Sequence, residues 1–207
     1  MELTYEKLKE VLNTGTFSEI KDKFENELVD VKEHPYDLTT DYGREELCKD
    51  VSAMLNNVGG FIILGVKGEQ DPNHRFERIK EVIGINNIAL NEQQYIQCLQ
   101  NGMYPEEPLV SIKEYELDGK KVFYIEVPQK STHRPFFRKK SNDFQYWQRT
   151  GSHATQLGID RLHEISRKGL EYESHLMNVE ANVEELVKQG RNNLRQQKSL
   201  DDLKKQL

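Results

Sequence analysis

The stretch Ser52-Ala-Met-Leu-Asn-Asn-Val-Gly-Gly-Phe-Ile-Ile-Leu-Gly-Val66 constrains the fold more than any other part of the chain. Around its start, apolar residues recur at the spacing of one helix face, at Leu47, Val51, Met54, Leu55 and Val58. Gly59-Gly60 permits the backbone angles with which a helix ends and the chain reverses. The next six residues are apolar except for Gly65, as is typical of a strand covered on both faces. The stretch therefore predicts a helix, a glycine turn and a buried strand.

Further strands are expected on both sides of this stretch. Residues 25–32 end in an alternation of apolar and polar side chains, which predicts a strand with one buried face. Residues 109–117 and 121–127 flank Asp118-Gly119, a typical signal for a tight hairpin turn. A last strand is expected over 146–149. Helices are expected within residues 1–22 and over 91–101, a polar loop over 67–74, and a helix or strand around 79–85. Without a repeated strand–helix–strand pattern, this mixture predicts an α+β fold, a mixed sheet with flanking helices.

The spacing of apolar residues changes near residue 159. Apolar residues follow an alternating three- and four-residue spacing from Leu162 to Leu186, which is typical of a coiled-coil seam. Beyond Gly190 polar residues take over the seam positions. We therefore expect a domain over residues 1–158, followed by a long helix or coiled coil over 159–207 that makes the protein a homo-oligomer. The alternative is a helix that packs along its own domain.

Composition excludes several classes of protein. The apolar runs are too short to span a bilayer, and the first residues lack the basic and then apolar layout of a signal peptide. The two cysteines, Cys48 and Cys98, form neither a metal-ligand spacing nor a disulfide framework. These features favour a cytoplasmic protein that does not bind membranes.

Positive charge is concentrated in one segment. Between Gln129 and His153 there are six basic residues and one acid, which gives this segment a net charge of +5. Since the whole chain has a net charge of −6, the remainder carries −11. Aromatic residues are interleaved with this charge. Such a segment on an acidic body suits a surface that contacts phosphates and stacks bases. Its binding candidates are Lys130, Arg134, Arg138, Lys139, Lys140, Trp147 and Arg149.

The set Ser52, Ala53, Asn56, Gly59-Gly60 and Gly65-Val66 resembles the core motif of the Schlafen-type AlbA domain. The resemblance extends over roughly residues 24–152 and includes Tyr146-Trp-Gln-Arg-Thr-Gly-Ser152. It implies a module that binds RNA or DNA. No Gly-x4-Gly-Lys-Ser/Thr phosphate loop occurs in the chain, so ATP binding, which is sometimes attributed to the family, has no local support.

Some Schlafen proteins cleave RNA, and in those proteins two acids of the first strand and a third after the Gly-Val strand are catalytic. By this resemblance Glu25 and Asp30 are the candidate acids, with Lys32 beside Asp30 on the same strand face. The usual third acid is replaced by Lys67-Gly68, and Glu69 is the nearest catalytic candidate. Converging carboxylates would bind Mg²⁺ or Mn²⁺, here through Glu25 and Asp30.

Two interpretations of the function stay open at this point. The first is a nucleic-acid-binding protein that cleaves structured RNA such as tRNA with a metal ion, in a defence or stress setting. The second is a non-catalytic regulator or adaptor that binds a nucleotide or a partner protein and assembles through its coiled coil. The sequence does not decide whether the protein is an enzyme.

Overall fold

The structure is a computed structural model. It describes residues 3–86, 90–104, 110–128, 137–140 and 143–158, and, beyond these, residues 160, 162–164, 166–167, 171, 174, 177 and 188–189. For residues 137–140 and 143–144 only the backbone is described.

The predicted helix, glycine turn and buried strand are confirmed. Helix α2 (Asp41–Leu55) begins after Thr40, whose side chain accepts a hydrogen bond from the N–H of Gly43, and is followed by strand β2 (Gly60–Leu64), which is buried throughout. Gly59 and Gly60 have φ angles of +74° and +143°. A Cβ atom on Gly60 would lie 2.3 Å from the carbonyl oxygen of Leu28, so both the backbone angle and the close approach require glycine.

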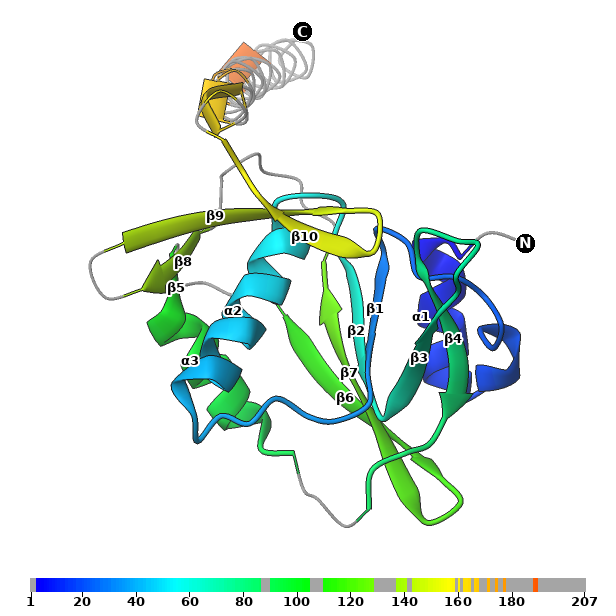
Figure 1. Ribbon diagram of the computed structural model, residues 1–207. Coiled ribbons are helices and arrows are strands. Elements are labelled where there is room, and N and C mark those ends of the chain that lie inside the picture. The colour runs from blue at the N-terminus through cyan, green and yellow to red at the C-terminus, as the bar shows by residue number, and fades with distance from the viewer. Residues whose placement is uncertain are drawn as a thin grey trace, which may run out of the picture.

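A mixed four-stranded sheet forms the centre of the domain, as the sequence predicted (Figure 1). Its order is β1 (Val29–Lys32), β2, β7 (Lys120–Val127) and β6 (Ser111–Leu117). Strands β1 and β2 are parallel and are connected through α2, whereas the other two pairs are antiparallel. The predicted hairpin is β6–β7, and Asp118 and Gly119 both have positive φ, as a primed turn requires.

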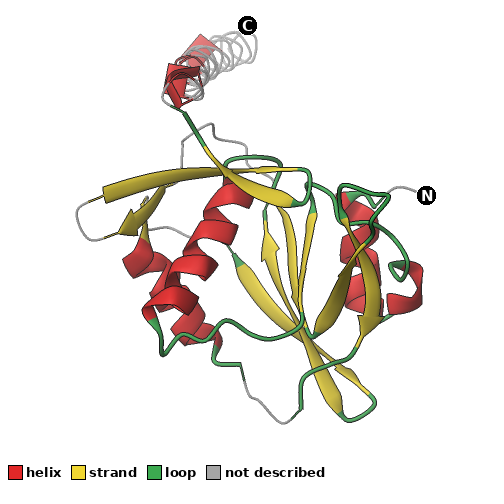
Figure 2. Cartoon of the chain, viewed as in Figure 1, coloured by secondary structure: helices red, strands yellow, loops and turns green. Residues whose placement is uncertain are grey.

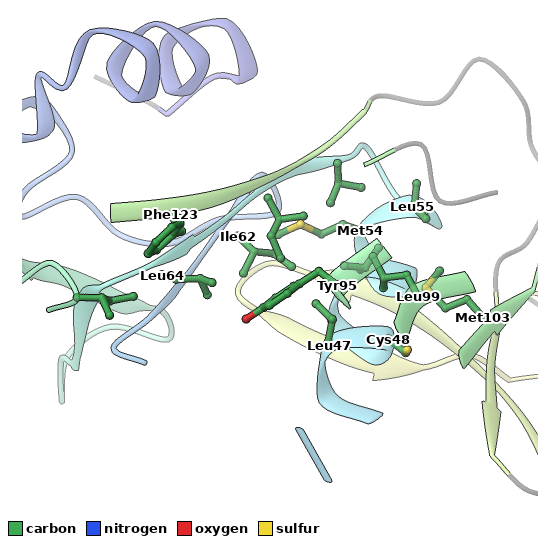
Figure 3. Packing of buried hydrophobic residues seen from close by; sticks show 14 residues of the cluster. Leu47, Cys48, Met54, Leu55, Ile62, Leu64, Tyr95, Leu99, Met103 and Phe123 are labelled. Atoms are coloured by element: carbon green, nitrogen blue, oxygen red, sulfur yellow. The ribbon is translucent and has the colours of Figure 1, made fainter. Parts of the chain in front are cut away.

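Apolar side chains cover both faces of this sheet. On one face, α2 and α3 (Glu92–Gly102) pack against β2 and β7, with Met54, Leu99 and Phe123 among the buried residues (Figure 3). On the other face lie α1 (Tyr5–Thr14), the short 3₁₀ helix η1 (Phe17–Glu19) and the pair β3 (Val66–Gln70) and β4 (Glu77–Val82). Figure 2 shows the helices on the two sides of the sheet.

A second, antiparallel sheet crosses the C-terminal end of α2 (Figure 1). Its order is β10 (His153–Gln156), β9 (Asp143–Thr150), β8 (Phe137–Lys140) and β5 (Met103–Tyr104). Two asparagines at the end of α2 bind it: the side-chain amides of Asn56 and Asn57 donate to the carbonyl oxygens of Trp147 and Arg149, at 2.8 and 3.0 Å. The asparagine of the motif therefore joins the helix to the second sheet.

Several expectations need correction. The polar loop predicted over 67–74 is wrong in its first part, since β3 continues to Gln70 and pairs with β4. Val58 lies beyond the end of α2 and is exposed, so the apolar stripe ends at Leu55. Most of the predicted coiled coil over 159–207 lies outside the described residues. The residues described there are helical, and Arg167 and Glu171 form an ion pair one turn apart at 2.7 Å.

Candidate functional site

The edge strand β1 brings two charged side chains to the face of the sheet on which α2 lies. Val29 and Val31 point into the opposite core, so the alternation along the strand directs Asp30 and Lys32 toward α2. Within the described residues, β1 is an edge strand of the central sheet and pairs with β2. Its position leaves these charges beside the second sheet rather than inside the apolar core.

Lys32 bridges two carboxylates from different elements. Its Nζ lies 2.8 Å from Oδ2 of Asp30 and 3.2 Å from Oδ2 of Asp50, which belongs to α2. The hydroxyl of Tyr36 donates to Asp50 Oδ2 at 2.7 Å, and Lys49 Nζ lies 3.5 Å from Oδ1 of the same group. Asp50 is thus held by two lysines and a tyrosine.

Arg149 of β9 contacts Asp30 as well and completes a charged cluster. This cluster consists of Glu25, Asp30, Lys32, Lys49, Asp50 and Arg149. Arg149 Nη1 lies 3.3 Å from Asp30 Oδ1, and its Nη2 lies 3.7 Å from Glu25 Oε2. The guanidinium also donates to the carbonyl oxygens of Asn26 and Val29, at 3.1 and 2.6 Å. Glu25 in turn accepts the N–H of Val31 at 2.7 Å. Arg149 therefore joins β9 to the strand and to the residues that lead into it.

These charges are almost completely removed from solvent. Glu25, Asp30, Asp50 and Arg149 are 4%, 5%, 6% and 4% exposed. Burial, reinforced by the neighbouring Asp30, raises the pKa of Glu25 to about 8 although Val31 and Arg149 oppose the shift. Burial and Asp30 also raise the pKa of Asp50. The cluster therefore contains a carboxyl group that exchanges its proton near neutral pH.

The pKa values of Lys32 and Tyr36 are shifted as well. Burial alone would lower the pKa of Lys32, but the carboxylates of Asp30 and Asp50 outweigh it and raise that pKa above its usual value. Burial and the nearby Asp50 raise the pKa of the Tyr36 hydroxyl well above its ordinary range. Lys32 consequently stays charged and Tyr36 stays a hydrogen-bond donor at neutral pH.

A cleft of about 530 Å³ opens onto the cluster. Its walls come from β1, α2, the β3–β4 pair and the turn between β9 and β10, and most of the lining side chains are charged. Besides Glu25, Asp30, Lys32, Lys49, Asp50 and Arg149, the lining includes Glu33, Glu77, Ser152 and His153. Such a lining suits a charged ligand rather than an apolar one.

The structure brings together three of the four predicted catalytic candidates, Glu25, Asp30 and Lys32. Glu69 does not line the cleft. It is partly exposed on β3, where Lys80 Nζ lies 2.6 Å and Arg78 Nη2 3.5 Å from its Oε2, and Lys80 lowers its pKa. The arrangement therefore offers no reason to group Glu69 with the buried acids.

The predicted nucleic-acid-binding residues lie in different surroundings. Arg149 is buried in the cluster, and Trp147 is half-buried with Lys49 Nζ 6.0 Å from its ring centre. The backbone of Arg138, Lys139 and Lys140 forms β8, adjacent to β9. Lys130 and Arg134 lie outside the described residues. Whether these residues contact nucleic acid stays a prediction.

Asp50 is the acid that the sequence analysis missed. It stands three residues after Leu47 and four before Met54, so it lies next to the apolar stripe of its helix. A carboxylate on the buried side of a helix needs a partner, and that requirement was the available signal. What the sequence could not supply is the partner, because Lys32 reaches Asp50 only in the folded domain.

The residues of the cluster, as they stand, do not fit a divalent metal ion. Within the described part of the chain, His, Cys, Asp and Glu side chains nowhere gather in a group of three or more that could hold one. Arg149 lies between Glu25 and Asp30, the two expected ligands, and Lys32 pairs with Asp30 as well. No helix among the described residues is long and apolar enough to cross a membrane.

Comparison with known proteins identifies one family. Residues 25–158 match the model of the family described as Schlafen, AlbA_2. A search of curated proteins finds no match.

Among solved structures, the chain is similar to the DIP2311 protein from Corynebacterium diphtheriae, at 18% identity and a TM-score of 0.48, over 78% of this chain and 29% of that one. It is also similar to the N-terminal domain of a Nitrosomonas europaea protein described as related to the ATP-dependent DNA helicase RecG, at 15% identity and a TM-score of 0.41, over 77% of this chain and 95% of that one. The chain thus spans less than a third of the first of these proteins.

Proposed function

The chain belongs to the Schlafen AlbA_2 family, which points to a function related to nucleic acids, and we propose that its charged cleft binds the sugar-phosphate backbone of RNA or DNA. The observation that carries this proposal is that Lys32, Lys49 and Arg149 all line one polar cleft. Acids line it as well, so a bound phosphate would replace carboxylates that now pair with these cations. Lysine and arginine side chains are the usual partners of backbone phosphates.

The basic segment adds a second surface for the same strand. Its +5 net charge includes Arg138, Lys139 and Lys140, and β8, which carries these three, pairs with β9, which carries Arg149. A nucleic-acid backbone that leaves the cleft along β9 would run beside the strand to which these residues belong. If six phosphates were contacted, the logarithm of the affinity would fall with the logarithm of the salt concentration at a slope of about −5.

The sharper form of the proposal is a ribonuclease acting on structured RNA such as tRNA. Glu25 exchanges a proton near neutral pH, as a general acid or base requires. Arg149 carries positive charge beside Glu25, and Lys32 carries it beside Asp30 in the same cleft, where both could stabilise charge that develops on a phosphodiester. Asp50, rather than Glu69, supplies the third buried acid of the cleft.

Mg²⁺ or Mn²⁺ is the cofactor that the family resemblance implies for such a reaction. Because Lys32 and Arg149 hold the carboxylates in the described arrangement, a divalent ion would bind only after these cations released them. We therefore derive no catalytic step through a metal ion. The metal requirement is a question for the experiment below.

The non-catalytic interpretation is favoured by a different observation. Arg149 already satisfies two carboxylates and two backbone carbonyls, and Asp50 is held by Lys32, Lys49 and Tyr36. Groups paired so completely suit a rigid structural core. In that case the domain is a non-catalytic regulator or adaptor that binds a nucleotide or a partner protein.

One experiment separates these functions. Purified protein is incubated with total tRNA, single-stranded DNA and double-stranded DNA, in Mn²⁺ and in EDTA, and both cleavage and gel retention are scored. The variants Asp30→Asn and Asp50→Asn are compared with the control Glu114→Gln. In the unaltered protein the Glu114 carboxylate pairs with Lys121 on the β6–β7 hairpin.

Cleavage in Mn²⁺ that is lost in Asp30→Asn and Asp50→Asn but kept in Glu114→Gln would support a metal-dependent ribonuclease. Cleavage in EDTA as well would support acid–base chemistry by the cluster alone. Retention without cleavage would leave a binding module. Neither retention nor cleavage would contradict the proposal and favour an adaptor that binds protein.

A further inference from the structure

Three aromatic side chains stand in a row beside the cleft, and the buried cluster makes no use of them. The rings of Phe24 and His74 are stacked, with centroids 3.6 Å apart and an interplanar angle of 21°. Phe76 meets His74 edge-on at 5.5 Å, and the guanidinium carbon of Arg75 lies 5.9 Å from the centre of the Phe76 ring. His74 and Arg75 are exposed, whereas Phe24 and Phe76 are half-buried.

The row lies next to the cleft at the turn between β9 and β10. Phe24 directly precedes Glu25, and Phe76 directly precedes Glu77, and both acids line the cleft. Phe76 also packs on Gly151, where a Cβ atom would lie 2.4 Å from its ring, and the next residue, Ser152, lines the cleft as well. The row therefore meets the rim of the cleft at Gly151, through the ring of Phe76.

The position of His74 is set by its own turn. The N–H of Phe76 donates to Nδ1 of His74 at 3.2 Å, so the neutral imidazole carries its proton on Nε2. The backbone N–H of His74 donates to the carbonyl oxygen of Asp71 at 3.1 Å, and the side-chain amide of Gln70 donates to the carbonyl oxygen of His74 at 3.0 Å. The ring is thus oriented before any ligand arrives.

Packing within the domain does not explain the whole arrangement. Phe24 and Phe76 cover parts of their own fold, but His74 stays exposed although Phe24 covers one face of its ring. An oriented, exposed aromatic ring with a nearby guanidinium is a surface suited to another flat ring. A base stacked on an aromatic or histidine side chain is the usual way in which proteins hold unpaired nucleotides.

We propose that His74, backed by Phe24 and flanked by Phe76 and Arg75, receives an unstacked nucleobase of a single-stranded nucleic acid whose backbone lies in the cleft. The inference rests on the proposed function, since it uses the same strand. A nucleotide joins a flat base to a charged phosphate, and the site places an aromatic surface beside a charged cleft in the same way. An unpaired strand is required because a base in a duplex has both faces covered.

The test compares two end-labelled oligoribonucleotides of equal length, an adenine homopolymer and an abasic strand with the same backbone. Affinities are measured by fluorescence anisotropy for the full chain, His74→Ala and His74→Phe. Lys80→Ala is the control, because Lys80 is an exposed residue of β4 whose ammonium pairs with Glu69. Far-ultraviolet circular dichroism and thermal unfolding check that each variant is folded.

We expect the unaltered protein to bind the adenine strand roughly five- to a hundredfold more tightly than the abasic strand, which is the range for one stacked base. His74→Ala should lose most of this preference while its affinity for the abasic strand is unchanged. His74→Phe should keep the preference, and Lys80→Ala should leave the ratio of the two affinities unaltered.

Three results would overturn the inference in distinguishable ways. Equal binding of both strands by the unaltered protein would exclude a base-stacking site while leaving the proposed function intact. A preference that survives in His74→Ala would place the base elsewhere. Binding of neither strand, together with no binding of tRNA or DNA, would contradict the proposed function itself.

Discussion

Arg149 lies 3.3 Å from Asp30, and this contact joins the second sheet to the edge strand of the central sheet. Both side chains are buried. Asp30 also pairs with Lys32, and Arg149 also contacts Glu25. The cleft exists because these two parts of the domain meet here. The stability of the domain and the geometry of the candidate site therefore depend on the same ion pairs.

The first prediction concerns the removal of Arg149. Arg149→Ala removes a cation from beside the buried Asp30 and frees two backbone carbonyls, so it should lower the free energy of unfolding by about 3–5 kcal/mol. Urea unfolding measures the change. Lys121→Ala, which removes an exposed pair with Glu114, should cost less than about 1 kcal/mol. Equal losses in the two variants would contradict the assigned role of Arg149.

The second prediction concerns pH. The folded pKa of Glu25 is about 8, above its ordinary value of 4.5, so between these values the folded state holds a proton that the unfolded state has released. The contribution of Glu25 to the free energy of unfolding should therefore be greatest near and below pH 4.5. It should be lost as the pH rises through about 8. Glu25→Gln should remove most of that fall.

Urea unfolding at pH 6 and pH 8.5 tests this behaviour in the unaltered protein and in Glu25→Gln. One pKa unit corresponds to about 1.4 kcal/mol, so a difference of a few kcal/mol between the two proteins' pH responses is expected. Equal changes in stability between the two pH values in both proteins would contradict the raised pKa of Glu25.

The third prediction concerns the glycine turn. Gly60→Ala combines a φ of +143° with a Cβ atom 2.3 Å from the carbonyl oxygen of Leu28, and should destabilise the domain by more than about 3 kcal/mol. Gly119→Ala is the matched control: its φ is +75°, but no atom lies within 4 Å of the added Cβ, so about 1–2 kcal/mol is expected. Thermal or urea unfolding compares the two. A similar cost at both sites would mean that the backbone near Leu28 yields to the added atom.

The fourth prediction concerns Asn56. Asn56→Ala removes the hydrogen bond to the carbonyl oxygen of Trp147 and should cost about 1 kcal/mol. Asn56→Asp is more disruptive, because a carboxylate placed against a carbonyl oxygen repels it. Unfolding measurements on the two variants test the order. Should aspartate be tolerated as well as alanine, the amide would not be what holds β9 on α2.

The elements that the sequence predicted well are those with strong local signals. The period of Leu47, Val51, Met54 and Leu55 indicates one face of a helix whatever covers it. Asp118-Gly119 selects a hairpin turn through its own backbone preferences. The region after Val66 was predicted less well: its residues are polar because β3 is mostly exposed, and it is a strand only because it pairs with β4.

The sequence by itself determined the helix, the glycine turn, the buried strand and the place of Asp30 on β1, because each depends on neighbouring residues of the chain. Only the tertiary structure decided which charges meet. Lys32 reaches Asp50 because α2 lies on the face of the sheet to which Lys32 points, and Arg149 reaches Asp30 because β9 crosses the end of α2. Burial then makes each charge depend on its partner, since a buried ion without an opposite charge is too costly to keep. That dependence arises from contacts between distant parts of the chain, which no local pattern records.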